Sequence, residues 1–193
     1  MKVKNRRFSG WRLLAVALAV SSFLLLAPVA SASAHSDTDS FKYLVGTGLI
    51  CKGSPTACPD VSRADNGDTI MISGRGTLSL HPLSVTGGGT YETSDAHNVL
   101  GEEGMWTALK LISFVSFGTS PPFPHRFVGG LALLRIHLTP EDGGPGFDAV
   151  LRITCLIGSP PPGANEGIRL RVPEVINFNQ EVSGNTLFIR ESE

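Results

Sequence analysis

The chain has 193 residues, 41% of them hydrophobic and 17% charged, with a formal net charge of −1. Its charges are unevenly spread. Residues 1–12 hold five basic residues and no acidic one, so residues 35–193 carry 11 basic against 17 acidic residues, a net charge of −6. This mildly acidic balance argues against nucleic acid or an anionic membrane surface as a partner, because both attract a positive patch.

The first 34 residues have the pattern of a cleavable signal peptide. A basic segment precedes an apolar stretch at residues 13–28, which ends at a proline instead of a basic stop-transfer cluster. Small residues at Ala32 and Ala34 predict cleavage before His35, with Ala30-Ser31-Ala32 as the alternative site. We therefore expect a secreted, extracellular protein that has no membrane segment after cleavage. The pair Arg6-Arg7 leaves a twin-arginine route open beside the general secretory route.

The remaining residues, 35–193, have the length of one domain. Short runs rich in β-branched and aromatic residues recur between Gly, Pro, Asn and Asp, and no segment has a sustained helical period. In chain order the strands are expected at residues 42–49, 69–73, 76–81, 84–91, 105–117, 127–138, 147–157, 167–172 and 186–190.

This pattern predicts a single all-β domain of about 8–10 strands, an antiparallel β-barrel or a barrel-like sandwich. Glycines within or beside the expected strands, such as Gly74, Gly76 and the run 87–89, would curl the sheet and so favour closure.

Three cysteines follow the signal peptide, and an oxidising compartment favours pairing of two of them. We expect a Cys58–Cys155 bridge, because a long-range crosslink removes more chain entropy than a short one. The alternative is a Cys51–Cys58 bridge that closes the Gly-Ser-Pro loop locally.

Alternating residues in the three expected strands from residue 127 to residue 172 place basic side chains on one face. If these strands are neighbours, that face forms an arginine strip, from which we expect binding of an anionic small molecule or a cell-surface glycan. Its members are Arg135, His137, Arg152, Arg169 and Arg171, of which we take Arg135, His137, Arg152 and Arg169 as candidate ligand-binding residues.

Motifs for catalysis and cofactors are missing from the sequence. It has no nucleophile elbow, zinc-binding helix, phosphate loop or dinucleotide fingerprint. We expect no cofactor and no metal. The alternative is calcium bound by one of two acidic turns, at Asp60, Asp65, Asn66 and Asp68 or at Glu141, Asp142 and Asp148. The acidic pairs Glu102-Glu103 and Glu141-Asp142 are interpreted as solvated turn residues.

Several phrases of the sequence together resemble a known group of proteins. They are CPDVSRADNGDTI, VTGGGTY, GMWTALKLISF, GGLALLRIHLTP, EGIRLRV and NTLFIR. The chain is similar through them to an uncharacterised family of small secreted all-β proteins of bacteria and fungi. The resemblance implies one exported β domain and no particular activity.

The leading functional hypothesis is therefore a secreted, non-catalytic binding or surface-interaction protein. The alternative is a small cofactor-free isomerase or hydrolase with a site in the barrel mouth, in which His137 or His81 would act as acid or base. A third hypothesis is a structural component of a cell surface or spore coat.

Overall fold

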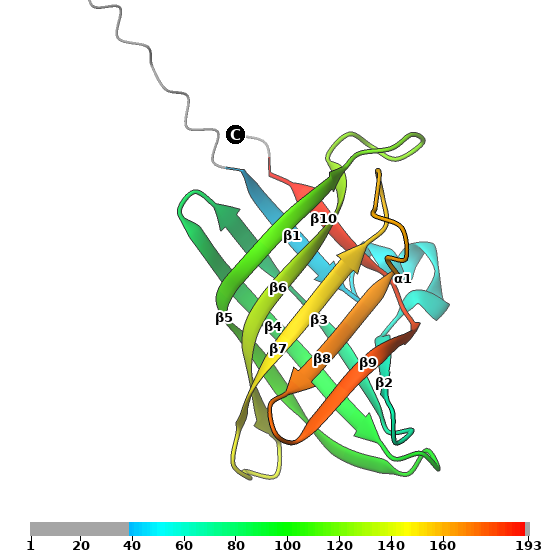
Figure 1. Ribbon diagram of the computed structural model, residues 1–193, viewed down its shortest axis with the longest axis vertical. Coiled ribbons are helices and arrows are strands. Elements are labelled where there is room, and N and C mark those ends of the chain that lie inside the picture. Colours follow the sequence, from blue (N-terminus) through cyan, green and yellow to red (C-terminus); the bar gives the residue numbers. More distant parts are fainter. Residues whose placement is uncertain (1–38, 192–193) are drawn as a thin grey trace, which may run out of the picture. The chain divides into compact units, whose positions relative to one another are not determined.

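A computed structural model describes residues 39–191, which form ten strands and two short helices (Figure 1). The predicted signal peptide and its cleavage sites lie outside the described residues. The elements in chain order are β1 (Ser40–Val45), α1 (Leu49–Gly53), the 3-10 helix η1 (Pro55–Ala57), β2 (Asp60–Ala64), β3 (Thr69–Leu80), β4 (Leu83–Ser94), β5 (Leu100–Gly118), β6 (Phe127–Pro140), β7 (Phe147–Cys155), β8 (Gly167–Val172), β9 (Ile176–Ser183) and β10 (Thr186–Arg190).

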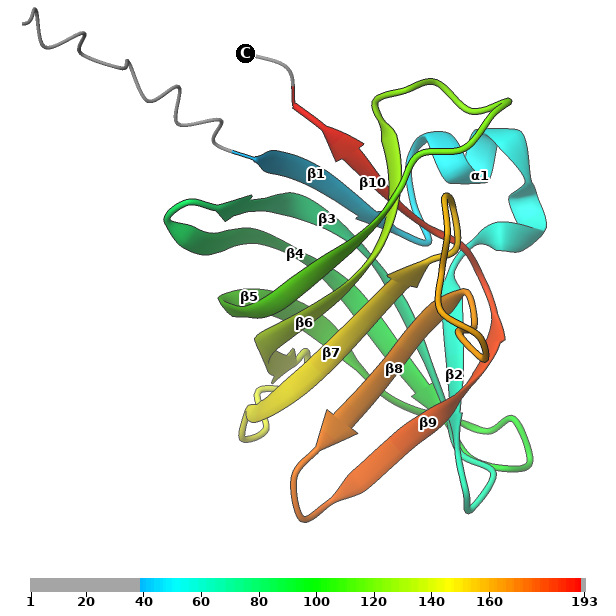
Figure 2. The same cartoon turned by 45° about the horizontal axis from the view of Figure 1, so that its top comes forward.

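All strand pairs are antiparallel, and the sheet closes on itself because two long strands each have two neighbours along one edge. Residues 69–72 of β3 pair with β2, whereas residues 74–79 of β3 pair with β1. In the same way β6 pairs with β10 at residues 127–128 and with β7 at residues 130–138. At one end of the barrel, β2, β9, β8 and β7 thus connect β3 to β6 and complete the ring. At the other end, β1 and β10 make this connection (Figure 2). The all-β, barrel-like prediction is confirmed.

The interior of the barrel is filled by alternating side chains, and two aromatic rings determine how closely its strands approach. Trp106 is fully buried, and its Nε1 donates a hydrogen bond to the carbonyl of Ser73 (3.0 Å). Its ring covers Gly74, where any side chain would overlap it. Tyr43 is buried likewise, and its hydroxyl donates to the carbonyl of Thr86 (3.0 Å). The glycines of β3 and β4 therefore leave space for the rings of Trp106 and Tyr43.

The structure differs from the expected strands at three places. Residues 69–73 and 76–81 belong to one strand, β3, because Gly74 stays in the ladder opposite Gly89. The strands β2 and β9 were not expected. In β2 the inward positions include two polar residues, Asp60 and Ser62, so the strand does not have an apolar alternation. The first expected strand, residues 42–49, ends early: β1 stops at Val45, and Leu49 begins helix α1.

The expected Cys58–Cys155 disulfide is wrong, and the alternative Cys51–Cys58 bridge is present. The helices α1 and η1 reverse the chain and bring the Cα atoms of Cys51 and Cys58 to 5.6 Å, within the range that a disulfide spans. Cys155 is buried at the end of β7 with a free thiol. Among residues 39–191, neither helix has the length and hydropathy of a membrane span.

Candidate functional site

The predicted arginine strip lies on the outer face of three adjacent strands. β6, β7 and β8 are neighbours, and Arg152 is opposite Arg169 in the ladder. At the β6 end of the strip, Asp148 contacts two of its members: it accepts a hydrogen bond from Arg135 Nη2 (2.6 Å), and its other oxygen lies 2.9 Å from His137 Nδ1. These two contacts, His137 first, lower the pKa of Asp148. The alternation of the expected strands gives no sign that Asp148 is a partner of the strip.

A second acid neutralises the other end of the strip. Glu181 on β9 accepts two parallel hydrogen bonds from Arg169, at Nε (2.7 Å) and Nη2 (2.8 Å). Between the ends, Arg152 Nε donates to Thr154 Oγ1 (3.2 Å), and partial burial together with the charge of Arg169 lowers the pKa of Arg152. Carboxylates thus pair with Arg135, His137 and Arg169, whereas Arg152 bonds to a threonine hydroxyl. The ligand-binding role of the strip stays a prediction.

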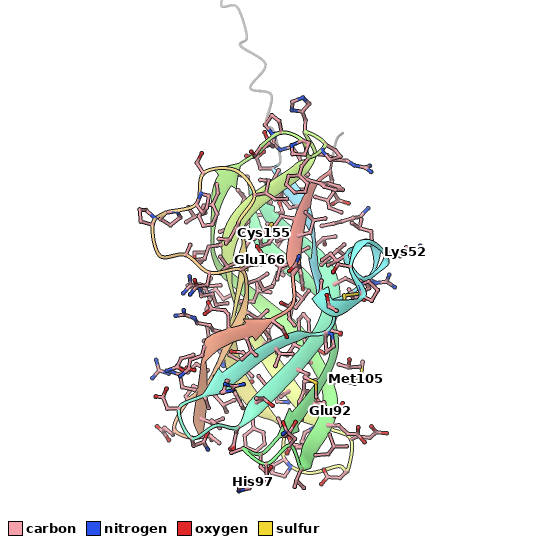
Figure 3. The ribbon with its side chains drawn as sticks, turned by 90° about the vertical axis from the view of Figure 1, so that its right-hand side faces the viewer. Lys52, Glu92, His97, Met105, Cys155 and Glu166 are labelled. Atoms are coloured by element: carbon pink, nitrogen blue, oxygen red, sulfur yellow. A yellow bond between two sulfur atoms is a disulfide. The ribbon has the colours of Figure 1, made fainter. Side chains whose placement is uncertain are left out.

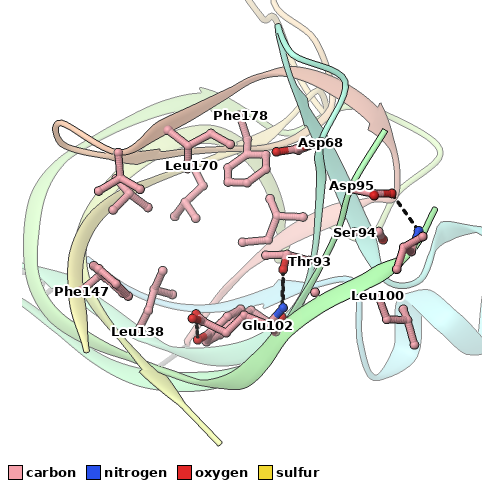
Figure 4. A pocket seen from close by; sticks show the side chains of 17 residues that line it. Asp68, Thr93, Ser94, Asp95, Leu100, Glu102, Leu138, Phe147, Leu170 and Phe178 are labelled. Carbon is pink, nitrogen blue, oxygen red and sulfur yellow. Dashed lines mark hydrogen bonds between the residues drawn. The ribbon is translucent and has the colours of Figure 1, made fainter. Parts of the chain in front are cut away.

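A cavity of about 390 Å³ lies at the end of the barrel where four hairpin turns meet, and we call it the mouth cavity. The turns join β2 to β3, β4 to β5, β6 to β7 and β8 to β9. Apolar side chains from strands all around the ring surround it (Figure 4). The main ones are Ile70, Leu138, Phe147, Leu170, Val172 and Phe178.

One polar pair belongs to this apolar wall. The hydroxyl of Tyr91 donates a hydrogen bond to Glu102 Oε1 (2.6 Å). Thr93 fixes the backbone of Glu102, because its Oγ1 accepts from the Glu102 amide (2.8 Å) and donates to the Glu102 carbonyl (3.1 Å). Burial, followed by the hydrogen bond to Glu102, raises the pKa of Tyr91, so the phenol keeps its proton and stays a hydrogen-bond donor.

The charged residues that line the mouth cavity are all acidic: Asp68, Asp95 and Glu102. Two of them serve the turns. Asp95 accepts hydrogen bonds from the backbone amides of His97 (2.8 Å) and Val99 (2.9 Å), and Asp68 accepts from the side chain of Asn66 (2.7 Å). Glu102 is the one whose carboxylate contacts a side chain of the cavity wall. The mouth cavity therefore offers acceptors and negative charge to a ligand.

The remaining expected residues lie elsewhere. His81 is exposed at the turn between β3 and β4, and His137 is on the outer face of β6, so neither lines the mouth cavity. No three His, Cys, Asp or Glu side chains in the described part of the chain converge as metal ligands would. Of the residues suggested for calcium, Asp60 is fully buried inside the barrel, away from the turn that contains Asp65.

Sequence reasoning missed the mouth cavity because its walls come together only in the closed ring. Glu102 was interpreted as a solvated turn acid, and the one local signal for its role was the alternation that directs Tyr91 inward on the neighbouring strand. No family model, curated protein or solved structure matches this chain. The resemblance to a family of secreted proteins stays a prediction.

Proposed function

We propose that the protein binds a small, mainly apolar molecule in the mouth cavity, and that the ligand presents a protonated amine or another hydrogen-bond donor to Glu102. The observation that carries this proposal is the Tyr91–Glu102 hydrogen bond on the wall of an otherwise apolar cavity. Sites for small molecules typically combine an apolar lining with a few fixed polar groups, as this cavity does.

The size of the cavity supports a ligand of modest length. Its volume of about 390 Å³ lies near the lower end of the range of about 300–1,000 Å³ that is common for small-molecule sites. Leu138, Leu170 and Phe178 are almost fully buried, so water has little access to the deep part of the wall. Transfer of an alkyl chain from water to such a wall contributes about 0.8 kcal/mol for each CH₂ group.

The charge of the cavity supports the choice of headgroup. Three carboxylates and no basic side chain line it, so a ligand carboxylate would meet repulsion, whereas an amine would meet attraction. The anionic ligand expected from the sequence belongs to the arginine strip on the outer face, which is a separate surface. Binding in the mouth cavity is favoured over the proposed isomerase or hydrolase activity, because the histidines suggested for that chemistry do not line it.

The predicted signal peptide and the local disulfide support action outside the cell. A disulfide persists in oxidising compartments such as the extracellular space. We therefore propose a secreted carrier or scavenger of small amphiphilic molecules.

Calorimetric titration with octylamine, octan-1-ol and octanoate tests the proposal, because these probes share a chain and differ in headgroup charge. Octylamine is expected to bind most tightly and octanoate most weakly.

Three variants locate the binding. Leu100→Trp, at an exposed residue of the rim, should weaken binding of all three probes. Glu102→Gln should remove the preference for the amine. Val182→Trp, at an exposed position that does not line the mouth cavity, is the matched control and should change nothing. Equal affinities for amine and carboxylate would refute the proposed headgroup, and no measurable binding of any probe would refute the site.

A further inference from the structure

A second cavity lies at the opposite ends of β7 and β8 from the mouth cavity, and we call it the α1 cavity. Phe147 begins β7 and lines the mouth cavity, whereas Cys155 ends β7 and lines the α1 cavity. Eight residue steps along a strand separate the two by about 26 Å. The fully buried residues Leu151 and Ile153 lie between these ends of β7, so the two cavities are separate spaces.

The α1 cavity has about 460 Å³ of space and a mostly apolar wall. One side of the wall is α1, which contributes Leu49 and Ile50, and none of the residues of this helix is buried. The opposite side comes from the chain after β7 and from β10, with Ile157 and Leu187. The helix thus holds apolar side chains over a space that the protein itself does not fill.

A disulfide and two backbone hydrogen bonds hold α1 in its place over the cavity. The Cys51–Cys58 disulfide closes the segment that contains α1 and η1. The amide of Asn185 donates to the carbonyl of Ala57 (3.1 Å), and the carbonyl of Asn185 accepts from the amide of Gly46 (3.1 Å). These bonds fix both ends of the segment to the barrel, so the helix does not collapse into the cavity.

Glu166 is the only charged residue among those that line the α1 cavity. Its Oε1 accepts a hydrogen bond from the Thr186 amide (2.8 Å), and its Oε2 accepts one from the Leu156 amide (2.7 Å). Thr186 Oγ1 lies 3.1 Å from Oε1 and 2.8 Å from the Thr154 carbonyl oxygen, and its one proton is shared between these two acceptors. A carboxylate has about four acceptor positions, so one position on Oε2 remains for a further donor. Figure 3 places Glu166 beside Cys155 at this end of the barrel.

We propose that the α1 cavity is a second, independent binding site, which takes an aromatic or branched apolar molecule bearing one amine. The apolar body fills the space under α1, and the amine donates to Glu166. The lining residues Phe123 and Phe127 supply aromatic surface for a flat ligand. This site does not depend on the function proposed for the mouth cavity.

Cys155 lines this cavity and is the one cysteine outside the disulfide. Because it is buried, and burial raises the pKa of its thiol to about 12, it reacts only when this end of the barrel opens, and a bound ligand lowers the rate of that opening. The test measures the rate at which N-ethylmaleimide labels Cys155 in the folded, oxidised protein, with and without 1-naphthylmethylamine. With this probe at ten times its dissociation constant, mass action predicts labelling slowed about tenfold. An equal concentration of 1-naphthylacetate should protect far less, because its carboxylate faces Glu166. Unfolded protein, which labels fully, calibrates the reagent.

Two variants separate this site from the mouth cavity. Leu49→Trp, at a partly exposed position of α1, should reduce the protection, and Glu166→Gln should remove the difference between the amine and the carboxylate. Leu100→Trp, at the rim of the mouth cavity, should leave the protection unchanged. Protection that disappears in Leu100→Trp, or a labelling rate that saturating amine leaves unchanged, would each overturn the proposal.

Discussion

The hydroxyl of Tyr91 lies 2.6 Å from Glu102 Oε1, across the ladder between β4 and β5. This contact fixes the direction of the carboxylate before any ligand arrives. Pre-orientation of this kind reduces the entropy that a bound headgroup must lose, so it contributes to affinity without touching the ligand itself.

The substitution Tyr91→Phe therefore tests the pair without changing the apolar wall. The ring remains, but Glu102 loses the donor that orients it, and the loss of about 1 kcal/mol should raise the dissociation constant of octylamine about fivefold. Octan-1-ol should be affected in the same direction. Calorimetry measures both values, and an unchanged affinity would show that the hydrogen bond has no part in binding.

Asp60 makes the free energy of unfolding decrease as pH rises from about 4 to 8. It is fully buried, neither carboxylate oxygen has a hydrogen-bond partner, and burial, reinforced by the charge of Glu166, raises its pKa from 3.8 to about 8. The folded protein thus keeps a proton that the unfolded chain releases above pH 4. The contribution of Asp60 to stability is complete below pH 4 and is lost as pH rises toward 8. Burial raises the pKa of Glu166 as well, so it acts with the same sign.

Asp60→Asn should weaken this dependence, because an amide does not titrate. Urea unfolding at pH 5 and pH 8 measures it: the wild-type protein should lose stability between these values, and Asp60→Asn should lose less. A variant that loses as much as the wild type would show that Asp60 is ionised in the folded state at both values.

Gly74 has no room for a side chain, because the Trp106 ring lies against it. Gly74→Ala should therefore lower the free energy of unfolding by about 2 kcal/mol or more, the usual cost of overpacking a core. Gly53→Ala is the matched control, since nothing lies within 4 Å of the added methyl group there. Equal urea midpoints for the two variants would contradict the packing described around Trp106.

The two acids beside the arginine strip differ in burial, so their removal should differ in cost. The Glu181 side chain is 7% exposed and binds Arg169 through two hydrogen bonds, whereas the Asp148 side chain is 44% exposed. Glu181→Ala should destabilise the protein by about 2 kcal/mol, because it leaves a partly buried guanidinium unpaired. Asp148→Ala should leave the urea midpoint nearly unchanged. The reverse order would mean that burial does not set the strength of these ion pairs.

The sequence predicts the barrel class well where apolar alternation is regular. Leu134, Ile136 and Leu138 are all buried, as the pattern around Arg135 and His137 predicts. Prediction failed at β2, because Asp60 and Ser62 occupy inward positions that the pattern assigns to apolar residues. The buried Ser62 is accommodated by the carbonyls of Phe178 and Gln180, which are distant in the chain.

The mouth cavity lay beyond the reach of sequence reasoning for a similar reason. Ile70, Leu138 and Leu170 meet in it only because two long strands each switch neighbours and close the ring. That switch depends on register, which hydrophobic alternation leaves open for strands distant in the chain. The disulfide depended likewise on a short helix, α1, that has no buried residue and so no periodic signal.

The most direct test of the central claim is methyl NMR of protein labelled at isoleucine, leucine and valine, titrated with octylamine. The account predicts saturable shifts at the methyl groups of Ile70, Leu138, Leu170 and Val172, which line the mouth cavity. Saturable shifts confined to other methyl groups, such as those of Ile157 and Leu187 in the α1 cavity, or no shifts at all, would contradict it.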